Sequence, residues 1–345
     1  MEYRLLGRSG LYVSEFSFGA MTFGGGMHGS VDVETATAMI DTCLEAGVNL
    51  IDTADVYGAG RSEEILGQVL KGRRDEVMIA TKAFGPTTPK PGPNDFGLSR
   101  KHLIDACDAS LRRLGMDYID LYQVHNFDGL TPMEEILRAL DDLVKAGKVR
   151  YIGHSNWASW QLAKATGVAE MRNFTPPVSQ QVQYSLLKRD AEFELFPAGV
   201  DMGVGALIWS PLAQGYLTGK FRKEVSEVTR LGTVNQVGYW EDDTSAKVLA
   251  ALDEVAAGYP GASLSQVALN FVRRKAGVSS ILVGARTMEQ LKDNLAAATW
   301  SLSDEDMAKL DRASRRGLPY PYSHHRTYGR GRIPMLGLMP IPESK

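Results

Sequence analysis

Four side chains that can exchange protons lie at the ends of three consecutive apolar segments of the chain. Asp52 ends one segment, and Tyr57 follows it in a glycine-flanked loop. Lys82 ends the next segment and His125 ends the one after that. If the segments are neighbouring parallel strands of a barrel, their carboxyl ends converge and bring the four groups into one pocket. An acid, a phenol, an amine and an imidazole together can move protons to and from a substrate oxygen.

The residue types suggest a division of roles within this set. A free phenol has a pKa of about 10, which makes tyrosine a weak acid at neutral pH. The ammonium group of Lys82 would favour the phenolate of Tyr57, and Asp52 would hold Lys82 charged and in place. Tyr57 is then the candidate general acid, and His125 the candidate hydrogen-bond donor that orients the substrate. Each residue alone would more often be an ion pair or a packing residue, so the inference depends on their joint occurrence.

The elements that must position these residues form a repeating pattern. Short apolar segments alternate with stretches whose apolar residues are spaced three and four apart, as in amphipathic helices. Four of these stretches cover 34–47, 99–115, 132–148 and 263–277, and a further helix-forming stretch begins at Ser62. The apolar segments, read as strands, are 15–21, 48–54, 77–82, 119–125, 149–155, 178–184, 205–211 and 279–285. Strand followed by helix, eight times over, predicts an α/β fold of the closed (β/α)8 barrel (TIM barrel) type.

Three regions depart from the repeat. Residues 3–15 are expected to form an N-terminal β-hairpin that turns at Gly7–Gly10. Long loops over 84–97 and 213–244 follow strands, which places them on the carboxyl-terminal face where barrels carry their active sites. A last helix over 303–316 precedes an aromatic, proline-rich tail. No boundary divides the chain, so residues 1–345 are expected to form one domain, with about 301–345 as its C-terminal helix and tail.

Composition excludes several classes of partner. A net charge of −3 gives no reason to expect binding to nucleic acid or to an anionic membrane. No apolar run is long enough to span a membrane and the N-terminus lacks a signal core, so a cytoplasmic location is expected. Cys43 and Cys107 fall in helical patterns and are expected to be packed, reduced thiols. His324 and His325 have no ligand partners at suitable spacing, so no metal site is expected.

Several segments of the chain carry distinctive motifs: LGRSGLYVSEFSFGAMTFG (6–24), DTADVYGAGRSEEILG (52–67), ATK (80–82), LYQVHNFD (121–128), GHSNW (153–157), WSPLAQGYLTGK (209–220) and VGARTMEQLKDN (283–294). In these motifs and in their order the chain resembles the aldo-keto reductase family, in particular the branch that includes bacterial reductases and potassium-channel β subunits. The resemblance covers nearly the whole chain. It implies a catalytic tetrad of Asp52, Tyr57, Lys82 and His125, the same residues that were selected above from their chemistry.

Reduction of a carbonyl requires a hydride donor, which no side chain supplies. The glycine triplet 24–26 is not a dinucleotide-binding fingerprint, so a Rossmann site is unsupported. The resemblance implies instead an extended nicotinamide dinucleotide across the barrel mouth. It places Ser155, Asn156 and Gln181 at the carboxamide and Trp209 against the nicotinamide ring. Ser210, Leu212, Gly215 and Lys220 are implied at the pyrophosphate, and Gly284, Arg286, Gln290, Asp293 and Asn294 at the adenosine end.

Cofactor choice and substrate class follow from fewer residues. Arg286 is a fork-shaped cation suited to a 2′-phosphate, which favours NADP(H) over NAD(H). The substrate pocket is expected to be an aromatic, mostly uncharged rim formed by Met21, Phe23, Phe84, Trp157, Tyr239 and Trp240. Such a rim favours small apolar aldehydes or ketones. His154, beside the Ser155–Asn156 pair, is expected to be packed or capping rather than catalytic.

Two functions remain open at this point. The first is NADPH-dependent reduction of aldehydes or ketones to alcohols. The second is an NADPH-binding regulatory subunit with little turnover, as the channel-associated members of the family suggest. Assembly of the chain into a homo-oligomer is compatible with either function.

Overall fold

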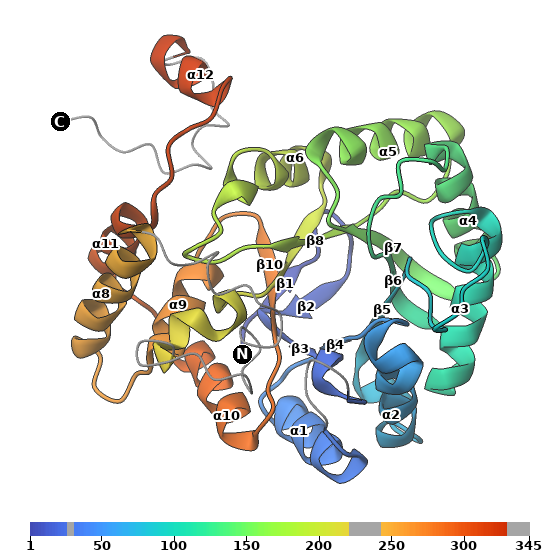
Figure 1. Cartoon of the computed structure of the whole chain (residues 1–345), viewed down its shortest axis with the longest axis horizontal. Coiled ribbons are helices and arrows are strands. Elements are labelled where there is room, and N and C mark those ends of the chain that lie inside the picture. The colour runs from blue at the N-terminus through green and yellow to red at the C-terminus, as the bar shows by residue number, and fades with distance from the viewer. Residues whose placement is uncertain (26–30, 221–242, 330–345) are drawn as a thin grey trace.

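The computed structural model describes residues 1–25, 31–220 and 243–329 of the 345-residue chain. Eight parallel strands close into a barrel, and helices surround it (Figure 1). The strands are β3 (Phe16–Gly19), β4 (Leu50–Asp52), β5 (Met78–Ala83), β6 (Ile119–Val124), β7 (Val149–Ser155), β8 (Ser179–Gln183), β9 (Gly205–Trp209) and β10 (Val278–Val283). Strand β10 pairs with both β9 and β3, which closes the ring. The (β/α)8 barrel predicted from the eight apolar segments is confirmed.

Side-chain caps explain where several helices begin. Asp32, Ser99, Ser263, Thr287 and Ser303 each accept a hydrogen bond from the backbone N–H three residues later, which satisfies a donor that the helix leaves unpaired. The helices are α1 (Val33–Glu45), α2 (Arg61–Val69), α3 (Arg100–Leu114), α4 (Met133–Lys145), α5 (Ser159–Arg172), α6 (Leu195–Met202), α8 (Asp243–Ala257), α9 (Leu264–Arg273), α10 (Met288–Ala296), α11 (Asp304–Ser314) and α12 (Tyr322–Tyr328).

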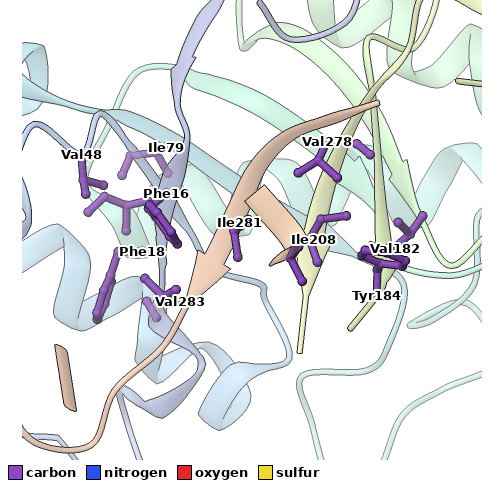
Figure 2. Packing of buried hydrophobic residues seen from close by; sticks show 14 of the residues in the cluster. Phe16, Phe18, Val48, Ile79, Val182, Tyr184, Ile208, Val278, Ile281 and Val283 are labelled. Carbon is purple, nitrogen blue, oxygen red and sulfur yellow. The ribbon is translucent and has the colours of Figure 1, made fainter. Parts of the chain in front are cut away.

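The hydrophobic core lies between the strands and the helices. Figure 2 shows Phe16 and Phe18 of β3 beside Ile281 and Val283 of β10, all buried on the outer face of the barrel. Cys43 and Cys107 are free and buried in the same cluster, and burial raises the pKa of the Cys43 thiol to about 12. Both cysteines are therefore packed, as predicted.

The inner face of the barrel is divided into an apolar layer and a polar layer. Leu50, Ala80 and Leu121 belong to a small buried cluster inside the barrel. Two residues further along each strand stand Asp52, Lys82 and Gln123. Because side chains on a strand return to the same face every second residue, the polar residues lie directly above the apolar ones, toward the carboxyl-terminal end.

The predicted N-terminal hairpin is confirmed and closes the lower end of the barrel. Strands β1 (Tyr3–Leu5) and β2 (Tyr12–Ser14) pair antiparallel. Leu6, directly after β1, and Val13, within β2, are fully buried against the apolar layer. The Arg8 N–H donates to the Gly203 carbonyl oxygen (2.8 Å), just before β9 begins. The hairpin therefore shuts the amino-terminal end and leaves the carboxyl-terminal end open.

The C-terminal tail contains a helix that its sequence does not indicate. Helix α12 follows Pro321 and lies at the periphery (Figure 1). Its Tyr322 donates to Glu194 Oε1 (2.5 Å) and stacks on Phe193. Proline and glycine on both sides, with no apolar periodicity between them, hide this short helix from sequence reasoning.

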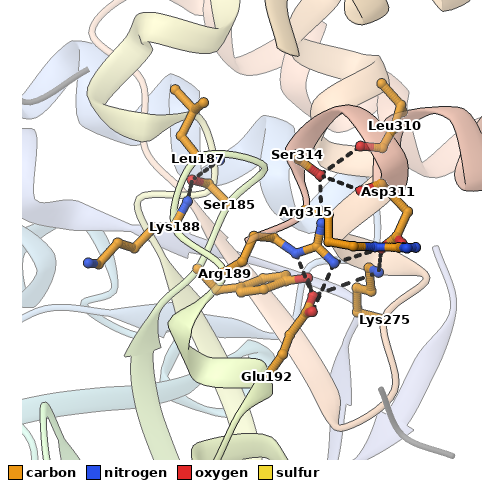
Figure 3. A network of polar contacts seen from close by, with 11 residues as sticks. Ser185, Leu187, Lys188, Arg189, Glu192, Lys275, Leu310, Asp311, Ser314 and Arg315 are labelled. Atoms are coloured by element: carbon orange, nitrogen blue, oxygen red, sulfur yellow. Dashed lines mark hydrogen bonds and ion pairs between the residues drawn. The ribbon is translucent and has the colours of Figure 1, made fainter. Parts of the chain in front are cut away.

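A buried ionic network fastens α11 to the barrel (Figure 3). Arg189, in the loop after β8, donates to Asp311 Oδ1 (2.7 Å) and to Ser314 Oγ (2.5 Å) of α11. Its Nε and Nη2 also donate to Glu192 Oε1 and Oε2, at 2.6 and 2.8 Å. Lys275 and Arg315 complete the shell around Asp311, at 3.0 and 2.7 Å. The Arg189 side chain is only 4% exposed, so each of these charges depends on the others for solvation.

Replacing Arg189 by Met should destabilise the fold by about 3–5 kcal/mol, because Asp311 and Glu192 would lose a buried partner. The matched control is Lys101→Met, which breaks the exposed pair between Lys101 and Asp105 and should cost less than about 1 kcal/mol. Urea unfolding of the two variants measures the difference. Similar small losses in both would show that the network does not anchor α11.

Candidate active site

A cavity of about 540 Å³ opens where the barrel strands end. It runs from the carboxyl-terminal ends of β4 and β6 across β7, β8 and β9 to the start of α10. Sequence-predicted residues that line it are Met21, Asp52, Tyr57, His125, Ser155, Asn156, Gln181, Trp209, Ser210, Leu212, Gly215, Lys220, Gly284, Arg286, Gln290, Asp293 and Asn294. Residues that sequence reasoning did not name include Thr22, Gln214, Thr218 and Ser265.

Lys82 lies beneath the cavity and joins Asp52 to Tyr57. Its Nζ donates to Asp52 Oδ1 (2.5 Å) and to the Thr53 carbonyl oxygen (2.6 Å). The Tyr57 hydroxyl lies 3.5 Å from the same nitrogen. Lys82 is fully buried and Asp52 is 2% exposed, so water does not screen their interaction. The three groups thus form one continuous chain that ends at the cavity wall.

Electrostatics keep Lys82 in its charged form. Burial alone would lower the pKa of the ammonium group, but the charges and hydrogen bonds of Asp52 and Tyr57 outweigh it and raise the pKa above its ordinary value. A permanent cation therefore faces the Tyr57 oxygen. A cation in this position stabilises a phenolate and makes proton release easier.

His125 stands against Tyr57 as a neutral imidazole. The two rings meet edge to face, with centroids 5.8 Å apart. Burial, and then the charge of Lys82, lowers the pKa of His125 to about 3. At neutral pH the ring carries one N–H and one acceptor nitrogen. It can therefore donate a hydrogen bond to an oxygen in the cavity without bringing a positive charge there.

Asp52 has two further partners that sequence reasoning missed. Gln123 and Gln181 both donate to Asp52 Oδ2, at 3.2 and 2.8 Å. The sequence could have indicated Gln123, because it lies two residues after Leu121 and two before His125, and this spacing puts it on the inner face of β6. The carboxylate is thus hydrogen-bonded at both oxygens.

Asn156 connects His125 to Trp209 at the middle of the cavity. Its Nδ2 donates to the His125 carbonyl oxygen (3.0 Å), and its Oδ1 accepts from Trp209 Nε1 (3.1 Å). Asn156 holds a left-handed backbone (φ 59°), which asparagine tolerates better than most residues. Ser155 Oγ, one residue earlier, donates to the Gln181 carbonyl oxygen (3.0 Å).

The loop after β9 has an unusual backbone at the cavity. Ala213, Gln214 and Gly215 have consecutive positive φ angles of 49°, 57° and 93°. Their N–H groups are used within the loop: Ala213 donates to the Ser210 carbonyl oxygen (3.0 Å), Gln214 to Ser210 Oγ (3.1 Å) and Gly215 to the Leu212 carbonyl oxygen (2.9 Å). Lys220, farther along the same loop, has its pKa lowered by burial and then by the charge of Arg286. Both cations line the cavity.

The far end of the cavity is framed by α10 and the loop before it. The Arg286 N–H donates to Gln290 Oε1 (2.9 Å), and Asn294 Nδ2 donates to the Gly284 carbonyl oxygen (3.5 Å). Asp293 accepts from Ser263 Oγ and Gln266 Nε2, both at 2.8 Å. These contacts fix the wall of the cavity from α9 to α10.

The predicted aromatic rim is largely placed elsewhere. Phe23 is fully buried and packs on Phe18, with ring centroids 5.3 Å apart. Trp157 is 4% exposed, stacks on the buried His154 and donates to the Asn126 carbonyl oxygen (3.2 Å). Phe84 packs against the core and is not among the lining residues. These three rings contribute to the hydrophobic core, where they bury more apolar surface than they would at the rim. Tyr239 and Trp240 lie outside the described residues.

Asp55, between Asp52 and Tyr57, is a second buried acid that sequence reasoning passed over. It is 1% exposed, and neither carboxylate oxygen makes a hydrogen bond of normal geometry to a described residue. Burial, and then the charge of Glu63, raises its pKa to about 8, although Arg113 and Lys82 oppose the shift. Asp55 is therefore a protonated, neutral carboxyl group at pH 7.

Asp55→Asn should stabilise the protein in a pH-dependent way. The folded protein retains a proton that the unfolded chain loses above its ordinary pKa of 3.8, so stability falls as pH rises from about 4 to about 8. Asparagine has no proton to lose. Its advantage should therefore grow by about 1.4 kcal/mol for each pH unit. Urea unfolding at pH 5 and pH 7 tests this, and an equal difference at the two values would contradict it.

No helix in the described ranges is long and apolar enough to cross a membrane. Those ranges also hold no cluster of three side chains suited to a metal ion.

Comparison with known proteins assigns the chain to a family. The Aldo/keto reductase family model matches residues 15–315. A Bacillus subtilis (strain 168) protein named "Uncharacterized oxidoreductase YrpG" is 39% identical over 324 residues, which cover 90% of this chain and 95% of the relative. A rice (Oryza sativa subsp. japonica) protein named "Probable voltage-gated potassium channel subunit beta" is 39% identical over 307 residues, covering 86% and 91%. The family match and the oxidoreductase relative support an oxidoreductase activity for this chain. The chain belongs to the aldo/keto reductase family.

Proposed function

We propose that this protein reduces aldehydes or ketones to alcohols with NADPH, reversibly, and that Tyr57 is the general acid. The observation that carries the proposal is the buried cation Lys82, held by Asp52 and placed 3.5 Å from the Tyr57 hydroxyl at the cavity wall. Ion pairs at protein surfaces are common, whereas a fully buried lysine beside a phenol at a cavity is characteristic of a functional site.

The four residues of this set divide the proton chemistry. Tyr57 donates its proton to the carbonyl oxygen as negative charge develops there. Lys82 stabilises the phenolate that remains, and Asp52 holds Lys82 in place. Neutral His125 donates an N–H to the same oxygen and orients it. In the reverse direction the Tyr57 phenolate takes the proton from the alcohol.

The cavity offers suitable groups for a nicotinamide dinucleotide. When bound, the cofactor supplies the hydride that no side chain can provide. Ser155, Asn156 and Gln181 would hold the carboxamide: both hydrogen bonds of the Gln181 amide use its nitrogen, so its oxygen is left for a ligand N–H. Trp209 would cover the ring.

The remaining predicted residues fit the rest of such a ligand. Ser210, Leu212, Gly215 and Lys220 would lie along the pyrophosphate. Gly284, Gln290, Asp293 and Asn294 would surround the adenosine end, where Arg286 would bind a 2′-phosphate. Because Lys220 and Arg286 would both be used by the phosphates of the cofactor, we infer an uncharged substrate beside Tyr57.

A second candidate function is a cofactor-binding regulatory subunit with little turnover. The name of the rice relative supports it. The connected set of Asp52, Lys82 and Tyr57 favours catalysis, because a binding module has no use for a tuned acid. Steady consumption of NADPH with 4-nitrobenzaldehyde separates the two: turnover favours the enzyme, and binding without turnover favours the regulatory subunit.

Tyr57→Phe should reduce the rate of carbonyl reduction by about two to four orders of magnitude, because the ring stays and the proton donor is lost. NADPH binding should survive. Tyr118→Phe removes a hydroxyl from a ring that packs between Arg74 and Arg150, so it should leave the rate unchanged. Wild-type turnover in Tyr57→Phe would refute the proposed acid.

Arg286→Ala should weaken NADPH binding by about one to two orders of magnitude, since one charge-assisted contact contributes about 1.5–3 kcal/mol. NADH binding should be nearly unchanged. Lys292→Ala, at an exposed position of α10, the helix that follows Arg286, is the matched control. Quenching of protein fluorescence gives both affinities. Equal losses for the two cofactors would assign Arg286 a structural role and remove the preference for NADPH.

A further inference from the structure

A fully buried amide, Gln123, bridges two parts of the candidate active site. Its Nε2 donates to Asp52 Oδ2 (3.2 Å), and its Oε1 accepts from Gln181 Nε2 (3.5 Å). Gln123 is 0% exposed and does not line the cavity, so it does not contact a ligand. From β6 it therefore reaches the acid–base set on β4 and the predicted carboxamide-binding residue on β8.

Strand β7 lies between β6 and β8 and carries a glycine beside Gln123. Gly153 of β7 is the register partner of Gln123 on one side and of Ser179 on the other. A Cβ atom on Gly153 would lie 2.1 Å from Ser179 Oγ and 3.3 Å from Gln123 Cγ. A side chain at residue 153 would therefore collide with Ser179 and crowd the Gln123 side chain, and glycine avoids both.

The contacts at Asp52 show why the amides are needed. Oδ1 faces the Lys82 ammonium at 2.5 Å, while Oδ2 receives the N–H groups of Gln123 and Gln181. A buried carboxylate is tolerated only when its remaining lone pairs are hydrogen-bonded. Two donors on Oδ2 also fix the plane of the carboxylate, so Lys82 is held at a defined distance from Tyr57.

We propose that Gln123 is a positioning residue that orients the Asp52 carboxylate and the Gln181 carboxamide at the same time. One side chain then links the proton-transfer set to the cofactor contact. The inference rests on the proposed function for its kinetic readout. Loss of Gln123 would leave Asp52 less well satisfied, so Asp52 would draw Lys82 more strongly and Lys82 would stabilise the Tyr57 phenolate less.

Two substitutions and one control test the proposal. Gln123→Leu removes the amide and keeps the bulk. Gln123→Glu restores the donor only while the new carboxyl group is protonated, and a carboxyl group next to Asp52 has a raised pKa. Gln180→Leu is the control, because Gln180 is a buried amide (1% exposed) on β8 that donates instead to the Leu195 carbonyl oxygen.

We expect Gln123→Leu to lower kcat for carbonyl reduction by about 10- to 100-fold, the effect of misplaced catalytic groups. The apparent pKa in its pH–rate profile should shift to a higher value. Gln123→Glu should approach the wild-type rate at acid pH and lose it progressively as pH rises. Gln180→Leu should leave both the rate and the profile unchanged. Three outcomes would each overturn the proposal. They are a wild-type rate in Gln123→Leu, a loss of rate in Gln123→Glu that does not depend on pH, and a loss of rate in Gln180→Leu as large as that in Gln123→Leu.

A second readout does not depend on turnover. The ultraviolet titration of tyrosinate, with and without Tyr57→Phe, isolates the phenol of Tyr57. Its pKa should be higher in Gln123→Leu than in the wild type and unchanged in Gln180→Leu. If the wild type reduces no carbonyl compound, the proposed function fails, and this titration still decides the positioning role: an unchanged Tyr57 titration in Gln123→Leu refutes it.

Discussion

The structure depends on one buried ion pair, the contact between Lys82 and Asp52 inside the barrel. A charge in a dry interior costs several kcal/mol unless every lone pair and proton around it is used. The barrel meets that requirement by giving a whole layer of its interior to polar groups. Lys82 is bonded to Asp52, Thr53 and Tyr57, and Asp52 is bonded to Lys82, Gln123 and Gln181. Few of these groups could be replaced without leaving another unpaired.

The polar layer requires apolar support beneath it. Leu50, Ala80 and Leu121 occupy the next positions inward on the same strands, and Leu6 and Val13 of the hairpin close them from below. Water is therefore excluded from the amino-terminal side of the ion pair. Because side chains return to the same face every second residue, each of these strands places a polar residue toward the cavity and an apolar residue beneath it. Sealing one end is part of what makes the other end reactive, because electrostatic interactions strengthen as water is removed.

The local parts of this arrangement could be predicted from the sequence. The eight strands were visible as apolar segments, and the predicted acid–base and cofactor-binding residues gather at one cavity because they end strands or follow them. Residues whose role depends on what lies opposite were not accessible in this way. Phe23 resembles a rim residue until its ring is seen against Phe18. Gln123 resembles a polar residue within a strand until its amide is seen against Asp52 and Gln181. Asp55 is neutral only because of the groups packed around it.

The distribution of charge along the cavity gives the site a direction. At one end Lys82 is paired with Asp52, and burial lowers the pKa of His125 to about 3, so the described residues around Tyr57 include an uncharged hydrogen-bond donor. At the other end Lys220 and Arg286 both line the cavity, and the charge of Arg286 lowers the pKa of Lys220. A ligand with an uncharged reactive end and an anionic remainder would be oriented by this asymmetry before any close contact forms. In the proposed complex the same separation would keep the phosphate charges of the cofactor away from Tyr57, where a nearby anion would oppose formation of the phenolate. The extent of the cavity, from β4 to α10, would therefore favour the acid chemistry proposed for Tyr57.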